Sequence, residues 1–362
     1  MNGGKKVWIG LLLSAIFVAL FFVTLDFGRL IDALSDANYF YVMPGIGLYL
    51  IGVWFRTLRW RWLLKHMRPI KTSRLFPVVV VGYMANNLLP MRLGELVRSY
   101  YVGKREDVSK TAALSTIFIE RLLDAITLLT FIAVLGLIVP LATVGRGFEE
   151  QSTIPWALLV TGVTVPFSVA FITILGVASF PSQSIRTVQA LIKPLPKTVE
   201  VRLIGFVELF VEGLASLKSL KMVGWLFILS LPVWLFEAGL FVFVGYSFGL
   251  DLIYDNLTDF IVAMVLVTAI ANIGASIPAA PGGIGLFELI ARETLVLLPL
   301  AAVDRAVAGG YVAVVHASLL LPMIVLGQFF LWTEHVSLRS LTKRGQEEAA
   351  PSASLPDKES TS

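Results

Sequence analysis

The 362-residue sequence contains no cysteine, only three histidines and little charge. Without cysteine the chain has no disulfide framework, no thiolate metal site and no cysteine nucleophile. The histidines, His66, His316 and His335, are widely separated and fit no metal-ligand spacing. We therefore expect no metal and no cofactor. Charged residues make up 15% of the chain, whereas a typical soluble domain has about 25%.

The sequence is instead rich in apolar residues. They make up 57% of the chain, and the mean hydropathy is +0.82. Several apolar runs approach the roughly 20 residues that a helix needs to cross about 30 Å of hydrocarbon. The short alternating segments of a membrane β-barrel are not seen. The sequence therefore predicts an all-α, polytopic membrane protein with about six to eight transmembrane helices.

The apolar segments give an expected order along the chain. They are Val7–Leu25, Tyr39–Phe55, Leu75–Leu89, Leu114–Val144, Pro155–Phe180, Val223–Leu250, Phe260–Ile277, Ile284–Leu300 and Val303–Trp332. The first resembles a signal peptide but is longer than the apolar core of about 7–15 residues in a cleaved signal. We expect it to stay as an uncleaved first span.

Two other regions differ from the spans in composition. Residues 181–222 alternate charged and apolar side chains, which predicts an amphipathic helix on the membrane surface. Residues 334–362 are polar, which predicts a disordered cytoplasmic tail. We therefore expect one integral membrane domain over residues 1–333.

Loop charge predicts the orientation. The segment Arg56–Arg74 carries seven basic residues and no acidic one, so the positive-inside rule places it in the cytoplasm as a loop. The acid-rich loops Asp26–Asn38, Gly145–Thr153 and Asp251–Asp259 are then expected outside. This scheme predicts a protein of the cytoplasmic membrane with both termini in the cytoplasm.

Two stretches interrupt the apolar pattern in a similar way. "NNLLPMRLGELVR" covers Asn86–Arg98, and "PAAPGGIGLFE" covers Pro278–Glu288. Each half of the chain offers asparagine, proline, glycine and glutamate in that order: Asn87, Pro90, Gly94 and Glu95, then Asn272, Pro281, Gly285 and Glu288. Proline removes a backbone donor and glycine permits turns, so the helices are expected to break here. Broken backbone at membrane depth is tolerated only inside protein or along a wet cavity.

The loop charges suggest that the two breaks face opposite ways. Basic residues flank Leu75–Leu89 on both sides, so this segment is expected to enter from the cytoplasm and turn back. Phe260–Leu300 is expected to be a hairpin from the outside, or two short spans. Two such broken or re-entrant hairpins form an inverted repeat, as in transporters whose substrate sites lie near the midplane.

The breaks also suggest a binding chemistry. A new helix start presents unpaired N–H groups that suit an anion such as phosphate, and Arg92, Arg98 and Arg121 are candidates to hold it. Glu95, Glu120 and Glu288 would balance charge, bind an amine or act as proton-linked carboxylates. The full candidate substrate-binding set is Asn87, Pro90, Arg92, Gly94, Glu95, Arg98, Glu120, Arg121, Asp124, Pro281, Gly282, Gly283, Gly285 and Glu288. No catalytic residue is predicted.

Each of these features also has a purely structural interpretation. The first break can be a solvated loop in which Glu95 stabilises a helix dipole. Glu120, Arg121 and Asp124 can form a structural ion pair inside the bundle. The second break can be a plain interhelical turn. His316, on an apolar segment, fits a hydrogen-bonded core histidine better than a proton relay.

At these residues the sequence resembles the lysylphosphatidylglycerol synthase transmembrane, or flippase-like, domain family. The resemblance rests on the two stretches above together with "ERLLD" at Glu120–Asp124, in the family's order, and spans Val7 to Trp332. It implies a multi-pass domain that moves or presents polar lipids. The soluble lysyl-transferase half of the family's bifunctional synthases is not expected in this chain, so no synthase activity is expected.

The resemblance and the two breaks together predict a protein that binds and translocates a polar lipid, without covalent chemistry. The expected partners are membrane lipids, either anionic or aminoacylated phospholipid or a polyprenyl-linked lipid, with a partner transferase as an option and no nucleic acid. Two alternatives stay open. One is a membrane enzyme that uses Glu95 or Asp124 as a base on a lipid headgroup. The other is a scaffold that recruits a lipid or glycosyl transferase through Pro181–Met222.

Overall fold

The computed structural model describes most of the chain and confirms the all-α class. The described residues are 26–89, 92–136, 165, 169, 172–193, 197–214, 217, 219–276, 281–298, 300–338 and 340–342. Within them the regular structure is helical and contains no strand. The expected span Val7–Leu25, Pro90, most of Pro155–Phe180 and the end of the predicted tail lie outside the described residues.

Four helices in the described ranges are long and apolar enough to cross a membrane. They are Tyr39–Leu64, which joins the short η1 (Tyr39–Tyr41) to α3 (Val42–Leu64), then α11 (Leu220–Ser247), α12 (Leu257–Gly274) and α14 (Arg305–Thr333). A further helix, α6 (Lys110–Leu135), is 26 residues long but carries Glu120, Arg121 and Asp124. The chain is therefore a polytopic α-helical membrane protein.

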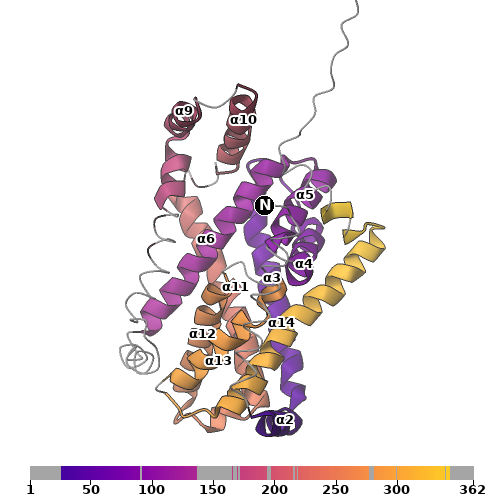
Figure 1. Cartoon of the computed structure of the whole chain (residues 1–362), viewed down its shortest axis with the longest axis vertical. Helices are drawn as coiled ribbons and strands as arrows, with labels where there is room; N and C mark the ends of the chain where they lie inside the picture. The colour runs from indigo at the N-terminus through magenta and orange to yellow at the C-terminus, as the bar shows by residue number, and fades with distance from the viewer. Residues whose placement is uncertain are drawn as a thin grey trace, which may run out of the picture.

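The helices follow the same order twice. In the first half, α3 is followed by α4 (Thr72–Leu88), α5 (Gly94–Glu106) and α6. In the second half, α11 is followed by α12, the short η5 (Pro281–Gly283), α13 (Leu286–Leu297) and α14. Each half is thus a long helix, a broken hairpin and another long helix. Figure 1 shows the α4–α5 hairpin in the upper half of the molecule and the α12–α13 hairpin in the lower half.

This arrangement confirms the expected pair of broken hairpins, one from each end of the molecule. The helix lengths bear on Phe260–Leu300, which was expected to be a hairpin from the outside or two short spans. At 1.5 Å per residue, the 12 residues of α13 span only about 18 Å, which is too short for about 30 Å of hydrocarbon. The α13 arm is therefore too short to be a full span, whereas α12 is long and apolar enough to be one.

The first hairpin depends on a glycine. A side chain at Gly94, where α5 begins, would place its Cβ 2.2 Å from the carbonyl oxygen of Gly82 and 2.6 Å from the backbone nitrogen of Asn86 in α4. Such distances are impossible for a real Cβ, so only glycine lets α5 begin against α4. Gly94 therefore sets how closely the two arms of the hairpin approach each other.

The expected loop at Arg56–Arg74 is wrong at its start. The helix α3 continues to Leu64, and the residues Arg56 and Arg59 are 4% and 0% exposed. Positive-inside reasoning treats arginines as solvent-facing, but residues three apart lie on one helix face. This face turns both arginines toward carboxylates of other helices.

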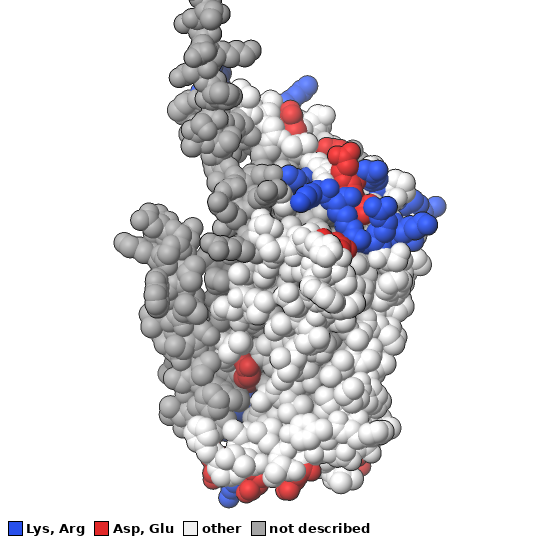
Figure 2. All heavy atoms as spheres, turned by 90° about the vertical axis from the view of Figure 1, so that its right-hand side faces the viewer, with Lys and Arg blue, Asp and Glu red and all other residues white. Residues whose placement is uncertain are grey.

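The remaining charge separates to the two ends of the molecule. Figure 2 shows lysines and arginines gathered at the upper end with some acidic residues among them, and mainly acidic residues at the lower end. The exposed basic residues there include Arg61, Lys65, Arg68, Lys71 and Arg74, and the exposed acidic ones include Asp26, Asp32, Asp36, Asp255 and Asp304. The stretch 181–222 forms two helices, α9 (Pro181–Ile192) and α10 (Lys197–Gly213), at the basic end. Of the expected tail, Leu341 is buried in the core instead of being disordered.

Candidate functional site

A cavity of about 360 Å³ lies where the two hairpins meet. Its walls come from both halves of the chain: α3 to α6 on one side, and α11 to α14 with η5 on the other. The side-chain nitrogen Nη2 of Arg92, at the tip of the first hairpin, donates to the carbonyl of Ala275 at the end of α12, at 3.0 Å. Asn87 contacts the carbonyl of Leu320 in α14 at 3.5 Å. The tips of the two hairpins are therefore joined at the cavity.

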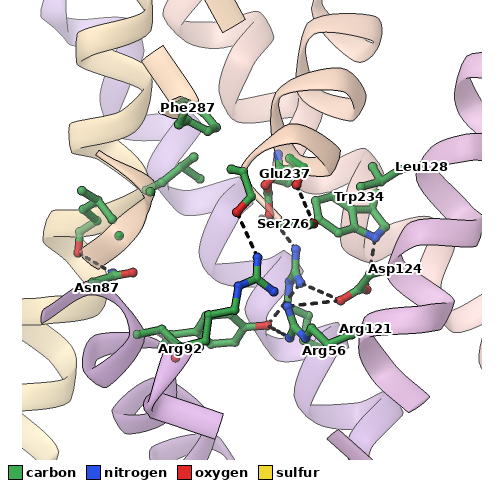
Figure 3. Close-up of a pocket in the computed structure, with 18 of the residues that line it drawn as sticks. Arg56, Asn87, Arg92, Arg121, Asp124, Leu128, Trp234, Glu237, Ser276 and Phe287 are labelled. Carbon is green, nitrogen blue, oxygen red and sulfur yellow. Dashed lines mark hydrogen bonds and ion pairs between the residues drawn. The ribbon is translucent and has the colours of Figure 1, made fainter. Parts of the chain in front are cut away.

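Three guanidinium groups point into this space, from Arg56, Arg92 and Arg121 (Figure 3). The hydroxyl of Tyr83 accepts hydrogen bonds from Arg56 at 3.2 Å and from Arg121 at 3.0 Å. Arg92 has a φ of 54°, a left-handed conformation that is uncommon for a side chain other than glycine. Such backbone is often found where function constrains the chain.

Carboxylates balance part of this positive charge. Glu237 of α11 lies 2.7 Å from Arg56, and both side chains are 5% exposed. One oxygen of Asp124 lies 3.6 Å from Arg56 and 3.6 Å from Arg121. Glu95 lies 3.8 Å from Arg121. The cavity wall is therefore a buried network of alternating charges.

A second layer of charge lies behind the wall. Arg59 lies 2.9 Å from Asp124 and 3.6 Å from Glu120. Arg98 lies 2.8 Å from the other oxygen of Glu120, and its guanidinium stacks over the ring of Trp60 at 3.7 Å. These side chains hold the network in place but do not face the cavity.

Counted together, the cavity wall and the layer behind it contain more arginines than carboxylates. The arginines are Arg56, Arg59, Arg92, Arg98 and Arg121, and the carboxylates are Glu95, Glu120, Asp124 and Glu237. Five cations and four anions leave a formal charge of +1. Among the described residues, Arg92 has no carboxylate within ion-pair distance and bonds only to a carbonyl. Arg92 is partly buried, and a cation withdrawn from water without a carboxylate partner favours an anionic ligand.

The second hairpin adds a titratable pair. His316 of α14 lies 2.6 Å through Nδ1 from an oxygen of Glu288 in α13, and 3.0 Å through Nε2 from the carbonyl of Gly282. The other oxygen of Glu288 accepts the backbone N–H of Gly285 at 2.7 Å. His316 lines the cavity together with Gly282. The pair therefore connects α13, α14 and the hairpin tip.

The structure brings half of the expected site residues to the cavity. Asn87, Arg92, Glu95, Arg121, Asp124, Gly282 and Gly283 line it. Gly94 and Arg98 border a smaller recess behind it, and Glu120 is fully buried between Arg59 and Arg98. Pro281 opens η5, while Gly285 and Glu288 form the start of α13.

Sequence reasoning missed Arg56, Glu237, Tyr83 and Trp234 as cavity residues. For Glu237 a signal was present, because it is an isolated carboxylate within the apolar α11, and such residues are rare and functional in membranes. Arg56 was assigned to the basic loop. The aromatic residues gave no signal, since aromatic side chains are common in every span.

A charged internal cavity between two oppositely oriented broken hairpins defines a class of multi-pass membrane protein. Within the described ranges, no cluster of three or more histidine, aspartate or glutamate side chains is arranged to hold a metal. The chain belongs to the family of the lysylphosphatidylglycerol synthase TM region, whose model matches residues 7–327.

Its relatives support the same family. The chain is 26% identical to the glycosyltransferase AglD of Haloferax volcanii over 93% of its own length and 56% of the relative's. It is 28% identical to a UPF0104 membrane protein of Methanocaldococcus jannaschii, over 42% of this chain and 46% of that one. It is 35% identical to a UPF0104 membrane protein of Methanothermobacter thermautotrophicus, over 31% and 33%. The chain thus spans about half of the length of the first two of these relatives and about a third of the third. No solved structure matches the chain significantly.

Proposed function

We propose that this protein binds a polar lipid by an anionic, phosphate-bearing headgroup and carries it across the cytoplasmic membrane. The observation that carries this proposal is Arg92, which has no carboxylate within ion-pair distance among the described residues and lies where the two hairpin tips meet. The cavity wall and the layer of charge behind it together have a formal charge of +1. A phosphate there accepts hydrogen bonds from Arg92 and Arg121, whose Nε makes no hydrogen bond within the described residues.

The fold supports movement of the headgroup as well as binding. Each hairpin closes the cavity from one end of the molecule, because their tips meet through Arg92 and Ala275. Separation of one tip at a time would open the cavity alternately to each side, which is how inverted-repeat transporters work. By the positive-inside rule, the end that carries Arg61, Lys65 and Lys71 faces the cytoplasm.

The headgroup has two candidate sources with shared chemistry. A phospholipid and a lipid-linked sugar phosphate both present a phosphate diester next to apolar chains. One relative is named a glycosyltransferase, which makes the sugar-bearing lipid an arm of the test. Amide and hydroxyl groups of Asn86, Asn272 and Ser276 in the cavity suit the hydroxyls of either headgroup.

Reconstitution in liposomes tests the proposal. Fluorescent phosphatidylglycerol, a labelled polyprenyl sugar phosphate and a labelled neutral diacylglycerol would each be followed from one leaflet to the other. We expect the native chain to accelerate exchange of at least one phosphate-bearing lipid but not of the neutral one. Exchange should fall to the rate of empty liposomes in Arg92→Ala with Arg121→Ala, and should persist in the exposed Arg29→Ala.

Two results would overturn the proposal. One is an exchange rate that is the same for the native chain and for the double cavity variant. The other is a new lipid species in the mass spectrum after incubation, which would indicate an enzyme. Gel filtration must show that the variants remain folded, because Arg121 also bonds to Tyr83.

A further inference from the structure

We propose that His316 and Glu288 form a proton-binding site, and that the bound proton holds the tip of the second hairpin against α14. Both ring nitrogens of His316 make a short polar contact. Nε2 of His316 lies 3.0 Å from the carbonyl of Gly282, and Nδ1 lies 2.6 Å from Glu288. The inference rests on the proposed function only for what the cavity carries.

The contacts fix the number of protons. A carbonyl oxygen only accepts, so Nε2 of His316 must carry a hydrogen to bond to Gly282. At 2.6 Å, Nδ1 and the oxygen of Glu288 also need a proton between them. Whether that proton is drawn on the ring or on the carboxyl, the pair holds one more proton than a neutral histidine beside an ionised glutamate.

Loss of that proton breaks one of the two contacts. If the remaining hydrogen stays on Nε2, the lone pair of Nδ1 faces the carboxylate of Glu288. If it moves to Nδ1, the lone pair of Nε2 faces the carbonyl of Gly282. No tautomer of the neutral ring satisfies both acceptors. Deprotonation therefore separates His316 from either Glu288 or the hairpin tip.

Of the two contacts of His316, the neighbouring groups make the one with Gly282 at the hairpin tip easier to break than the one with Glu288. The ring of His316 stacks on Phe287 at 4.3 Å, and the second oxygen of Glu288 is fixed by the N–H of Gly285. Gly282 has a φ of 62° and lies in the short η5, where a glycine moves at little conformational cost. Because Gly282 lines the cavity, its release opens the cavity wall.

The proton also changes the charge that a headgroup meets. The protonated pair has no net charge, so the arginine and carboxylate network keeps its formal +1. Without the proton, ionised Glu288 beside a neutral ring contributes −1, and the total becomes 0. Other titratable and charged groups face the same cavity: Arg56 of α3, Tyr83 of α4, Arg92 and Glu95 of the first hairpin tip and α5, Arg121 and Asp124 of α6, and Glu237 of α11. Proton and phosphate are therefore expected to bind together.

The absence of cysteine makes the test direct, because one introduced thiol is the only one in the chain. Ser276→Cys places it in the cavity wall, and Ser73→Cys places a reference thiol on the exposed start of α4. In reconstituted vesicles, reaction with a small methanethiosulfonate reagent would be measured between about pH 5 and about pH 8, the range in which histidine changes charge. The rate at position 276, divided by the rate at position 73, removes the intrinsic pH dependence of a thiol.

In the otherwise native chain, we expect this ratio to rise at least about tenfold with pH, since the hydrogen bond that is lost involves a charged group. Glu288→Gln can donate to Nδ1 at any pH, so the ratio should stay low throughout. His316→Leu has no link to Gly282, so the ratio should stay high throughout. His66→Gln, at a histidine that contacts the carbonyl of Glu212 instead, should keep the native profile.

A ratio that does not change with pH in the native chain, or a native pH response in Glu288→Gln, would overturn the inference. If His316→Leu does not fold, the comparison of the native chain with Glu288→Gln decides alone. Lipid exchange in the same vesicles separates the two proposals. A pH-dependent ratio of labelling rates without lipid exchange would contradict the proposed function but not the proton site. If the native chain and Glu288→Gln exchange lipid equally at every pH, and the ratio of labelling rates does not change with pH, the proton site is contradicted but the proposed function is not.

Discussion

Arg92 donates a hydrogen bond to the carbonyl of Ala275 at 3.0 Å across 183 residues of sequence. This contact joins the tips of the two hairpins and leaves the guanidinium charge without a carboxylate. Arg92 thus combines two tasks, closing the cavity and presenting positive charge to it.

Replacing Arg92 by glutamine removes the charge but keeps a donor for Ala275. We expect exchange of anionic lipids to fall about 10- to 100-fold, because a hydrogen bond to a charged group contributes about 1.5–3 kcal/mol and each 1.4 kcal/mol is about tenfold. Exchange of a zwitterionic lipid should fall less. The measurement is the initial rate for each lipid, with Arg29→Gln at the exposed end of the molecule as the control. An equal fall for both lipids would mean that Arg92 only closes the cavity.

Replacing one partner of the Arg56–Glu237 ion pair should destabilise the protein more than replacing both partners by apolar residues. Glu237→Gln leaves the buried Arg56 with only the more distant carboxylate of Asp124, at 3.6 Å, and we expect a loss of up to about 3–5 kcal/mol in the free energy of unfolding. In Arg56→Met with Glu237→Leu, much of that loss should be recovered, since Asp124 keeps Arg59 at 2.9 Å. Denaturant titration in detergent measures both. Arg56→Met and Glu237→Leu, each also measured alone, complete the cycle, and strict additivity of these two changes would show that the pair is not coupled.

The approach of α5 to α4 makes a specific prediction about glycine. Gly94→Ala must push the start of α5 away from the backbone of α4, and overpacking of this kind costs about 1–3 kcal/mol or more. Gly47, in the middle of α3, has open space where its Cβ would be, so Gly47→Ala should leave stability unchanged or raise it. Thermal denaturation of the two variants in one detergent makes the comparison. Equal midpoints would contradict the close packing at Gly94.

Much of the architecture could be predicted, because proline, glycine and hydropathy act locally. The two breaks follow from Pro90, Pro281 and the neighbouring glycines, and their opposite entry follows from loop charge. The extent of α3 could not be predicted in this way. Loop charge assigns Arg56 and Arg59 to solvent, and only the carboxylates of α6 and α11 explain why these arginines are buried.

The site was partly predictable for the same reason. Residues beside a break, such as Arg92 and Gly282, could be found because the break itself is visible in the sequence. Glu237 lies 113 residues beyond Asp124 in the chain, and both meet Arg56 only through the packing of three helices. His316 was interpreted as a hydrogen-bonded core residue, which the structure confirms, but its partner Glu288 was paired with it only by the fold.

Arg98 provides a test of structure against ligand binding. The sequence makes it a candidate for the phosphate, yet its guanidinium lies 2.8 Å from Glu120 and stacks on Trp60 behind the cavity wall. Lysine keeps the charge of arginine but lacks the planar guanidinium group, which stacks on aromatic rings and forms bidentate hydrogen bonds. For Arg98→Lys we therefore expect a loss of about 2 kcal/mol in stability, the scale of a desolvated cation–π contact.

In the same variant, the preference for anionic over neutral lipid should stay unchanged, because Arg92 and Arg121 still face the cavity. Arg61→Lys, at an exposed arginine one helix away, is the matched control and should change neither quantity. The two measurements are the denaturation midpoint and the ratio of exchange rates for the two lipids. A lost lipid preference with an unchanged midpoint would mean that Arg98 binds the phosphate. In that case the wall between Arg98 and the cavity must open during transport.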